Sequence, residues 1–156
     1  MMVLGTWSVT WKEYTADTYT YGSSIRFCKD RSVEFENRMM PPGTVIKEWS
    51  SKTNFQTDKT EPALPIIDGE GRYEIVSDID CEEGQNVLLR LLFYDRFGNE
   101  ADSIAIWDKT ATFQCPLRTY SYKLQLINGG LTRLVFHSVT IREISDDTDR
   151  YSSKTE

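Results

Sequence analysis

Val87–Tyr94 reads VLLRLLFY, with Arg90 as its single polar side chain apart from the terminal tyrosine hydroxyl. A run that is apolar at almost every position predicts a central strand covered on much of both faces. Its core candidates are the odd-numbered side chains Val87, Leu89, Leu91 and Phe93.

Shorter stretches on either side of this run alternate apolar and polar residues. A period of two places successive side chains on opposite faces of a strand, so each stretch predicts a strand with one wet face. The clearest apolar sets are Trp7, Val9 and Trp11, then Tyr73, Ile75 and Ile79, then Tyr120, Tyr122, Leu124 and Leu126.

Turn residues separate the predicted strands. Lys29-Asp30 suits the turn of a hairpin, and Asn128-Gly129-Gly130 is the strongest hairpin signal in the sequence. Leu64–Ile67 is short and contains a proline, which suits an edge strand.

The last predicted strand changes parity along its length. Leu134 and Phe136 hold one parity, whereas Val139 and Ile141 hold the other. A β-bulge near His137-Ser138 would keep all four side chains on the same face, so we predict one there.

About ten short strands, with turn signals every eight to twelve residues or so and no convincing amphipathic helix, predict an all-β, antiparallel two-sheet sandwich. We expect one domain over residues 1–144, followed by a polar tail over residues 145–156 that is disordered.

Charge disfavours a nucleic-acid-binding protein. Lys and Arg total 18 against 24 Asp and Glu, and no basic stripe is available to neutralise phosphates. The N-terminus lacks the pattern of a signal peptide, and no stretch is long and apolar enough to cross a bilayer, so we expect a cytosolic protein.

The sequence offers little material for catalysis. The lone histidine, His137, lies in an apolar strand, where a satisfied or surface histidine is favoured over a general base. The three cysteines, Cys28, Cys81 and Cys115, form no zinc motif and are expected to be reduced and buried. We therefore expect no enzyme activity and no cofactor.

An acidic turn raises the question of a metal. Asp78, Asp80, Glu82 and Glu83 precede Gly84, and hard cations prefer several carboxylates on a tight turn. The glycine is misplaced for an EF-hand, so an ordinary acidic turn is the favoured interpretation and calcium binding stays the alternative.

Aromatic residues beside polar ones could form a sugar-binding surface, because sugar C–H groups stack on flat rings while amides and carboxylates bind hydroxyls. Burial in the core or at a subunit interface is the alternative for each ring. The candidates are Trp49, Phe55, Tyr94 and Trp107, with their polar neighbours Asn54, Gln56, Asp95 and Asp108.

Three stretches of the sequence resemble a known family. Residues 35–46 read FENRMMPPGTVI and residues 49–56 read WSSKTNFQ, and residues 92–98 continue the match with LFYDRFG. On these residues the chain resembles the third accessory secretory protein of the bacterial accessory Sec system.

This resemblance implies a jelly-roll fold like that of carbohydrate-binding modules, and a cytoplasmic subunit that associates peripherally with a membrane translocase. The implied partners are two larger accessory secretory proteins, the motor ATPase and serine-rich-repeat glycoprotein adhesins whose export the complex assists. The matching stretch adds partner- or substrate-binding candidates, which are Met40, Pro41, Trp49, Asn54, Phe55 and Gln56.

One alternative function remains at this point. A free-standing lectin-like module, cut from a secreted glycan-active protein, would share the predicted sandwich and the aromatic candidates. Binding of glycan without protein partners would distinguish it.

Overall fold

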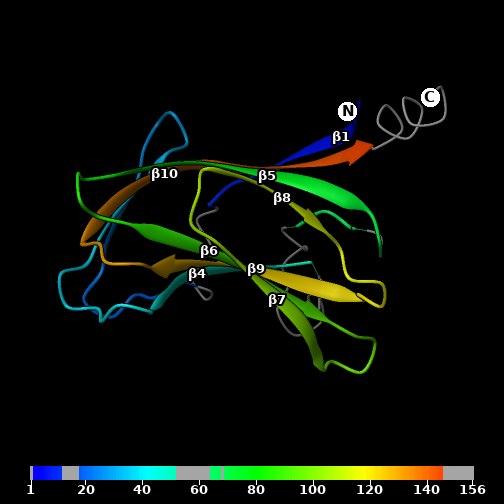
Figure 1. The fold of residues 1–156 in the computed structure, drawn as a ribbon. Coiled ribbons are helices and arrows are strands. Elements are labelled where there is room, and N and C mark those ends of the chain that lie inside the picture. The colour runs from blue at the N-terminus through cyan, green and yellow to red at the C-terminus, as the bar shows by residue number, and fades with distance from the viewer. Residues whose placement is uncertain (1, 12–17, 52–63, 68, 146–156) are drawn as a thin grey trace.

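A computed structural model of the protein describes residues 2–11, 18–51, 64–67 and 69–145. Within these residues ten strands form two antiparallel sheets that face each other (Figure 1). The strands are β1 Met2–Val9, β2 Ser24–Phe27, β3 Val33–Glu36, β4 Val45–Ser50, β5 Arg72–Cys81, β6 Val87–Tyr94, β7 Glu100–Ile106, β8 Thr110–Gln114, β9 Ser121–Asn128 and β10 Arg133–Ser145. The all-β sandwich is therefore confirmed.

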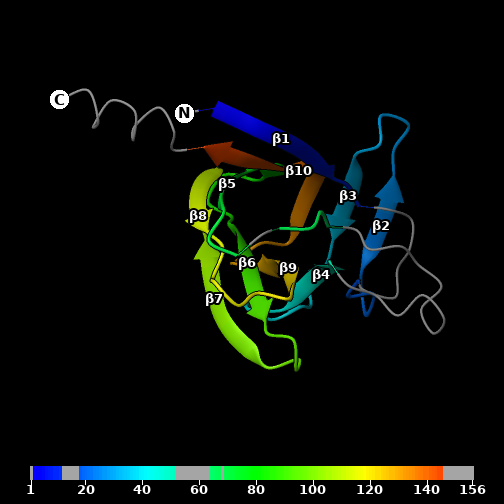
Figure 2. The same ribbon diagram turned by 90° about the vertical axis from the view of Figure 1, so that its right-hand side faces the viewer.

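The long strand β10 organises the first sheet, whose order is β2-β3-β10-β5-β8. Its first residues, Arg133–Phe136, pair with β3, and its later residues, Val139–Ser145, pair with β1 (Figure 2). The second sheet has the order β4-β9-β6-β7. Val87–Tyr94, which is β6, is thus an interior strand as predicted, and Leu89, Leu91 and Phe93 are buried.

The predicted β-bulge in β10 is confirmed. The register with β5 shifts between Phe136 and Ser138, so His137 is an extra residue on β10. Leu134, Phe136, Val139 and Ile141 are all buried. Because the bulge changes the parity of the strand, both halves of β10 cover the same core.

Aromatic rings join the two sheets across the core. Phe136 of β10 stacks on Trp49 of β4 at 5.4 Å between centroids, and it meets Trp11 edge-on at 5.7 Å. The Trp49 indole Nε1 donates a hydrogen bond to the Thr10 carbonyl at 3.0 Å. Trp49 is only 2% exposed and is a core residue.

The hairpin predicted at Asn128-Gly129-Gly130 is wrong, although a turn is present there. β9 pairs with β4 and β6, whereas β10 pairs with β1, β3 and β5, so this turn carries the chain from the second sheet to the first. Turn chemistry is local and does not specify which sheet the following strand joins.

The Asn128 side chain stabilises this turn. Its Oδ1 accepts hydrogen bonds from the N–H groups of Gly130 at 2.9 Å and Leu131 at 2.7 Å. Its Nδ2 donates to the Pro41 carbonyl at 3.1 Å, and the side chain is buried. Asn128 therefore ties the proline turn before β4 to the crossover between the sheets.

Leu64–Ile67 is not a strand, so the edge strand predicted for these residues is wrong. Leu64 and Ile67 are buried, and the Tyr122 hydroxyl donates to the Pro65 carbonyl at 2.5 Å. Burial raises the pKa of Tyr122, so this hydroxyl stays a neutral donor. The segment packs on the sandwich by side chains instead of adding a strand.

The cysteines match the expectation only in part. All three are free thiols, but Cys115 alone is buried, while Cys28 and Cys81 are partly exposed.

The residues that the structure describes contain no helix long and apolar enough to span a membrane. Residues 146–156 lie outside the described residues, so the disordered tail stays a prediction.

We expect Trp49→Ala to lower the free energy of unfolding by about 3–5 kcal/mol, because it empties a large part of the core. The matched variant Trp107→Ala removes an indole that is 60% exposed and should cost about 1 kcal/mol or less. Urea denaturation followed by circular dichroism measures both. Equal losses in the two variants would contradict the assignment of Trp49 to the core.

We expect Asn128→Ala to lower the free energy of unfolding by about 2–4 kcal/mol, because it leaves buried backbone groups without partners. Asn99→Ala, at an exposed asparagine in the turn between β6 and β7, is the control and should stay within about 0.5 kcal/mol of the wild type. Thermal melts of both variants give the comparison, and an unchanged Asn128→Ala melt would refute the role of the side chain.

Candidate functional site

A cleft of about 270 Å³ opens where β5 leads into β6 and β7 leads into β8. We call it the Trp107 cleft. This volume is just below the roughly 300–1,000 Å³ that is usual for small-molecule sites, which suits a compact ligand. Its lining combines apolar Ile79, Val87, Leu89, Ile106 and Trp107 with polar Asp80, Gln85, Asn86, Asp108 and Lys109.

Trp107 supplies an exposed aromatic surface at this cleft. A Cβ added at Gly129 would lie 2.8 Å from the indole Cζ3 and 3.2 Å from the Asn86 carbonyl oxygen. The indole therefore lies directly against the backbone of the crossover turn, which needs a residue without a side chain at position 129. The rest of the indole stays open to solvent.

The loop between β5 and β6 is held against the same turn. Gln85 donates from Nε2 to the Thr132 hydroxyl and accepts from the Thr132 N–H, both at 3.1 Å. The Gly129 N–H donates to the Asn86 carbonyl at 3.2 Å. These bonds fix the polar side of the cleft relative to Trp107, so the site is preformed.

Cys81 lies in the cleft but is not suited to nucleophilic catalysis. Burial raises the pKa of its thiol, the neighbouring Asp80 raises it further, and Lys109 opposes the shift. A reactive cysteine needs the thiolate, so an upward shift disfavours that chemistry. What the cleft offers is an aromatic surface and hydrogen-bonding groups.

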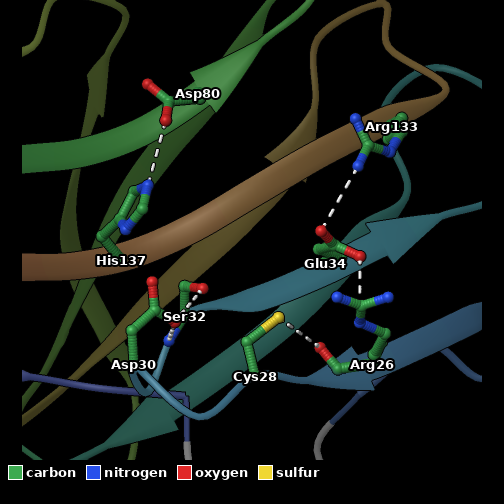
Figure 3. A network of polar contacts seen from close by, with 8 residues as sticks. All are labelled: Arg26, Cys28, Asp30, Ser32, Glu34, Asp80, Arg133 and His137. Atoms are coloured by element: carbon green, nitrogen blue, oxygen red, sulfur yellow. Dashed lines mark hydrogen bonds and ion pairs between the residues drawn. The ribbon is translucent and has the colours of Figure 1, made fainter.

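Polar contacts link the side chains of neighbouring strands on the outer face of the first sheet, and Figure 3 shows them close by. Glu34 contacts Arg26 at 3.4 Å and Arg133 at 3.6 Å, and His137 Nε2 lies 3.0 Å from Asp80 Oδ2. Such exposed pairs are screened by solvent and contribute little to stability.

Asp78, Asp80 and His137 bring one ligand atom each to within 4.8 Å of one another. Among the described residues this is the cluster that could hold a metal, and neither Glu82 nor Glu83 belongs to it. Of the four acidic residues considered for calcium, only Asp78 and Asp80 therefore belong to the cluster, and its third member is a histidine from β10.

Tyr94 and Asp95 lie at the opposite end of the second sheet from Trp107. β6 and β7 are antiparallel, so Ile106 is opposite Leu89 while Tyr94 is opposite Glu100. Asp95 Oδ1 accepts the N–H groups of Phe97 at 2.9 Å and Asn99 at 3.0 Å, which shapes the turn. The structure does not bring these aromatic candidates into one surface.

The candidates from the family motif build the fold where the structure describes them. Met40 and Trp49 are buried, so neither indole nor thioether is presented to a ligand, and Pro41 is exposed. Asn37 Oδ1 accepts the N–H groups of Met39 and Met40, at 2.8 and 3.0 Å. A sugar-stacking role for Trp49 is corrected to a core role for this reason.

The remaining candidates, Asn54, Phe55 and Gln56, lie outside the described residues. Sequence reasoning identified Trp107 and Asp108 but missed Gln85, Asn86 and Gly129. Gly129 carried a signal, since a glycine pair after a strand can mark close approach of another group. That signal was interpreted as a hairpin.

Two solved structures closely resemble the chain. The structure of accessory secretory proteins 1, 2 and 3 of Streptococcus pneumoniae matches with a TM-score of 0.84 and 30% identity, over 88% of this chain and 96% of that one. The Glycosylation Associate Protein complex from Streptococcus agalactiae matches with a TM-score of 0.83 and 27% identity, over 90% of this chain and 45% of that one.

A more distant structure shares the fold alone. The xylanase 10B modules of Clostridium thermocellum, which include a carbohydrate-binding module, match with a TM-score of 0.54 and 15% identity over 82% of this chain and 26% of that one. The jelly-roll architecture expected from the resemblance agrees with this likeness.

Relatives in sequence agree with the structural matches. An accessory Sec system protein of Streptococcus gordonii is 36% identical over 85% of this chain and 83% of its own length. Another from Staphylococcus aureus is 31% identical over 92% of this chain and 45% of its own length. The family model described as Accessory Sec secretory system ASP3 matches residues 18–143. The chain therefore belongs to the Accessory Sec secretory system ASP3 family.

Proposed function

We propose that this chain is a non-catalytic subunit that binds two larger accessory secretory proteins and serine-rich-repeat glycoprotein adhesins, and thereby assists adhesin export. The observation that carries the proposal is the match to nearly the whole of a chain solved in the structure of accessory secretory proteins 1, 2 and 3. The matching chain of the Streptococcus agalactiae complex supports the same assignment.

In this proposal the subunit works in the cytoplasm, peripherally associated with the translocase, and it contacts the motor ATPase. Family membership supports this placement. The raised pKa of Cys81 and the pairing of His137 with Asp80 support a binding role, because neither group is arranged as a nucleophile with its base.

The adhesin is recognised through its glycans at the Trp107 cleft. An exposed indole beside a carboxylate and an amide suits a sugar ring, since C–H groups stack on the indole while Asp108 or Asn86 binds hydroxyls. A bare serine-rich polypeptide lacks a flat apolar ring face to stack there.

We expect Trp107→Ala to weaken binding of glycosylated adhesin by about 1–3 kcal/mol, or roughly 5- to 150-fold, and to leave recovery of the two larger subunits unchanged. Phe97→Ala is the matched control, because Phe97 is an exposed aromatic residue in the turn between β6 and β7, at the other end of the second sheet. Co-purification and binding of glycosylated and unglycosylated adhesin provide the measurements.

Three outcomes would count against the proposal. Recovery of a lone monomer, with neither larger subunits nor adhesin, would refute the complex. Glycan binding by a chain that recovers neither larger subunit from cells would favour a free-standing carbohydrate-binding module. Equal binding of unglycosylated adhesin would remove the glycan from the proposal.

Gly129→Ala tests the same site while keeping the indole. The new methyl group would lie 2.8 Å from Trp107 Cζ3, so the indole must move and glycosylated adhesin should bind more weakly. Gly5→Ala is the control, since its Cβ would lie 3.1 Å from Trp7 on β1 instead. Indole N–H signals in NMR spectra would show which tryptophan each variant displaces, and an unmoved Trp107 signal would contradict the packing argument.

A further inference from the structure

Three potential metal ligands meet on the outer face of the first sheet. Asp78 and Asp80 are two residues apart on β5, so their side chains leave the same face of the strand. His137 comes from the neighbouring strand β10, and its Nε2 lies 3.0 Å from Asp80 Oδ2 (Figure 3). All three ligand atoms lie within 4.8 Å of one another.

The β-bulge places the histidine beside the two carboxylates. Ser138 is opposite Asp78, and Phe136 is opposite Ile79, so the extra residue His137 sits between these two pairs. Its position is set by the backbone register of two hydrogen-bonded strands. Strands hold ligands more accurately than loops do, and this is the support that a metal site needs.

We propose that Asp78, Asp80 and His137 bind a divalent transition-metal ion, with Zn²⁺ as the best-matched ion. One imidazole and two carboxylates form a mixed nitrogen and oxygen set, and imidazole favours zinc over calcium or magnesium. With metal–ligand bonds of about 2.0–2.1 Å, ligands around a tetrahedral zinc are about 3.3 Å apart, so small side-chain rotations complete the site. Three protein ligands leave the fourth position open to water or a partner's group.

Electrostatics favour a cation at this point. Two carboxylates within 4.8 Å of one another repel unless a positive charge lies between them. Arg133 on β10 is engaged by Glu34.

A simple histidine–aspartate pair is the alternative, and it needs only one carboxylate. Asp78 distinguishes the two, because a metal uses it as a third ligand whereas the pair does not. Asp78 and Asp80 are both exposed and His137 is partly exposed, so substitutions there should leave the fold intact. The site is accordingly open and its affinity for zinc should be in the micromolar range.

The test is isothermal titration of the tag-free full chain with Zn²⁺ after treatment with a chelator, at neutral pH. We expect one ion per chain, and we expect His137→Ala, Asp80→Asn and Asp78→Asn each to weaken binding by about tenfold or more. Glu74→Gln is the matched control, because Glu74 is on β5 and pairs with Arg142 of β10 but lies outside the cluster. His137 ring signals in NMR spectra should shift on addition of Zn²⁺.

Several results would overturn the proposal. Absence of zinc binding, or zinc binding that His137→Ala leaves unchanged, would refute it. Loss of binding in a Cys28→Ser, Cys81→Ser variant with all three ligands intact would assign the ion to thiols. Weaker zinc binding in His137→Ala with no change in Asp78→Asn would refute the three-ligand site. Melting curves of each variant separate loss of ligand from loss of fold.

Discussion

The β-bulge between Phe136 and Ser138 is the constraint on which both faces of the first sheet depend. One extra residue changes the parity of β10, so apolar side chains before and after it point into one core. A strand of 13 residues with unbroken alternation would turn one of these sets to solvent. The extra residue is His137 itself, which lies beside Asp80 on the outer face, so core and surface share one cause.

The stretch that marks the family in sequence mainly builds the interior. Trp49 stacks on Phe136, and Asn37 and Asn128 hold the proline turn that precedes β4. Buried Lys47 lies with its ammonium 5.6 Å from the Trp11 ring and 6.0 Å from the Trp49 ring, where the two indoles favour its positive charge. Where the structure describes it, this motif therefore contributes buried side chains and turn-forming hydrogen bonds to the fold.

Side-chain periodicity predicted the sandwich, the interior position of Val87–Tyr94 and the bulge, because each depends on which face of a strand is buried. It could not predict how strands join across sheets, so the turn at Asn128 was mistaken for a hairpin. It also could not predict that Tyr94 and Trp107 lie at opposite ends of the second sheet, which follows from the antiparallel pairing of β6 with β7. His137 and Asp80 are 57 residues apart, and only the register of β5 with β10 reveals their contact.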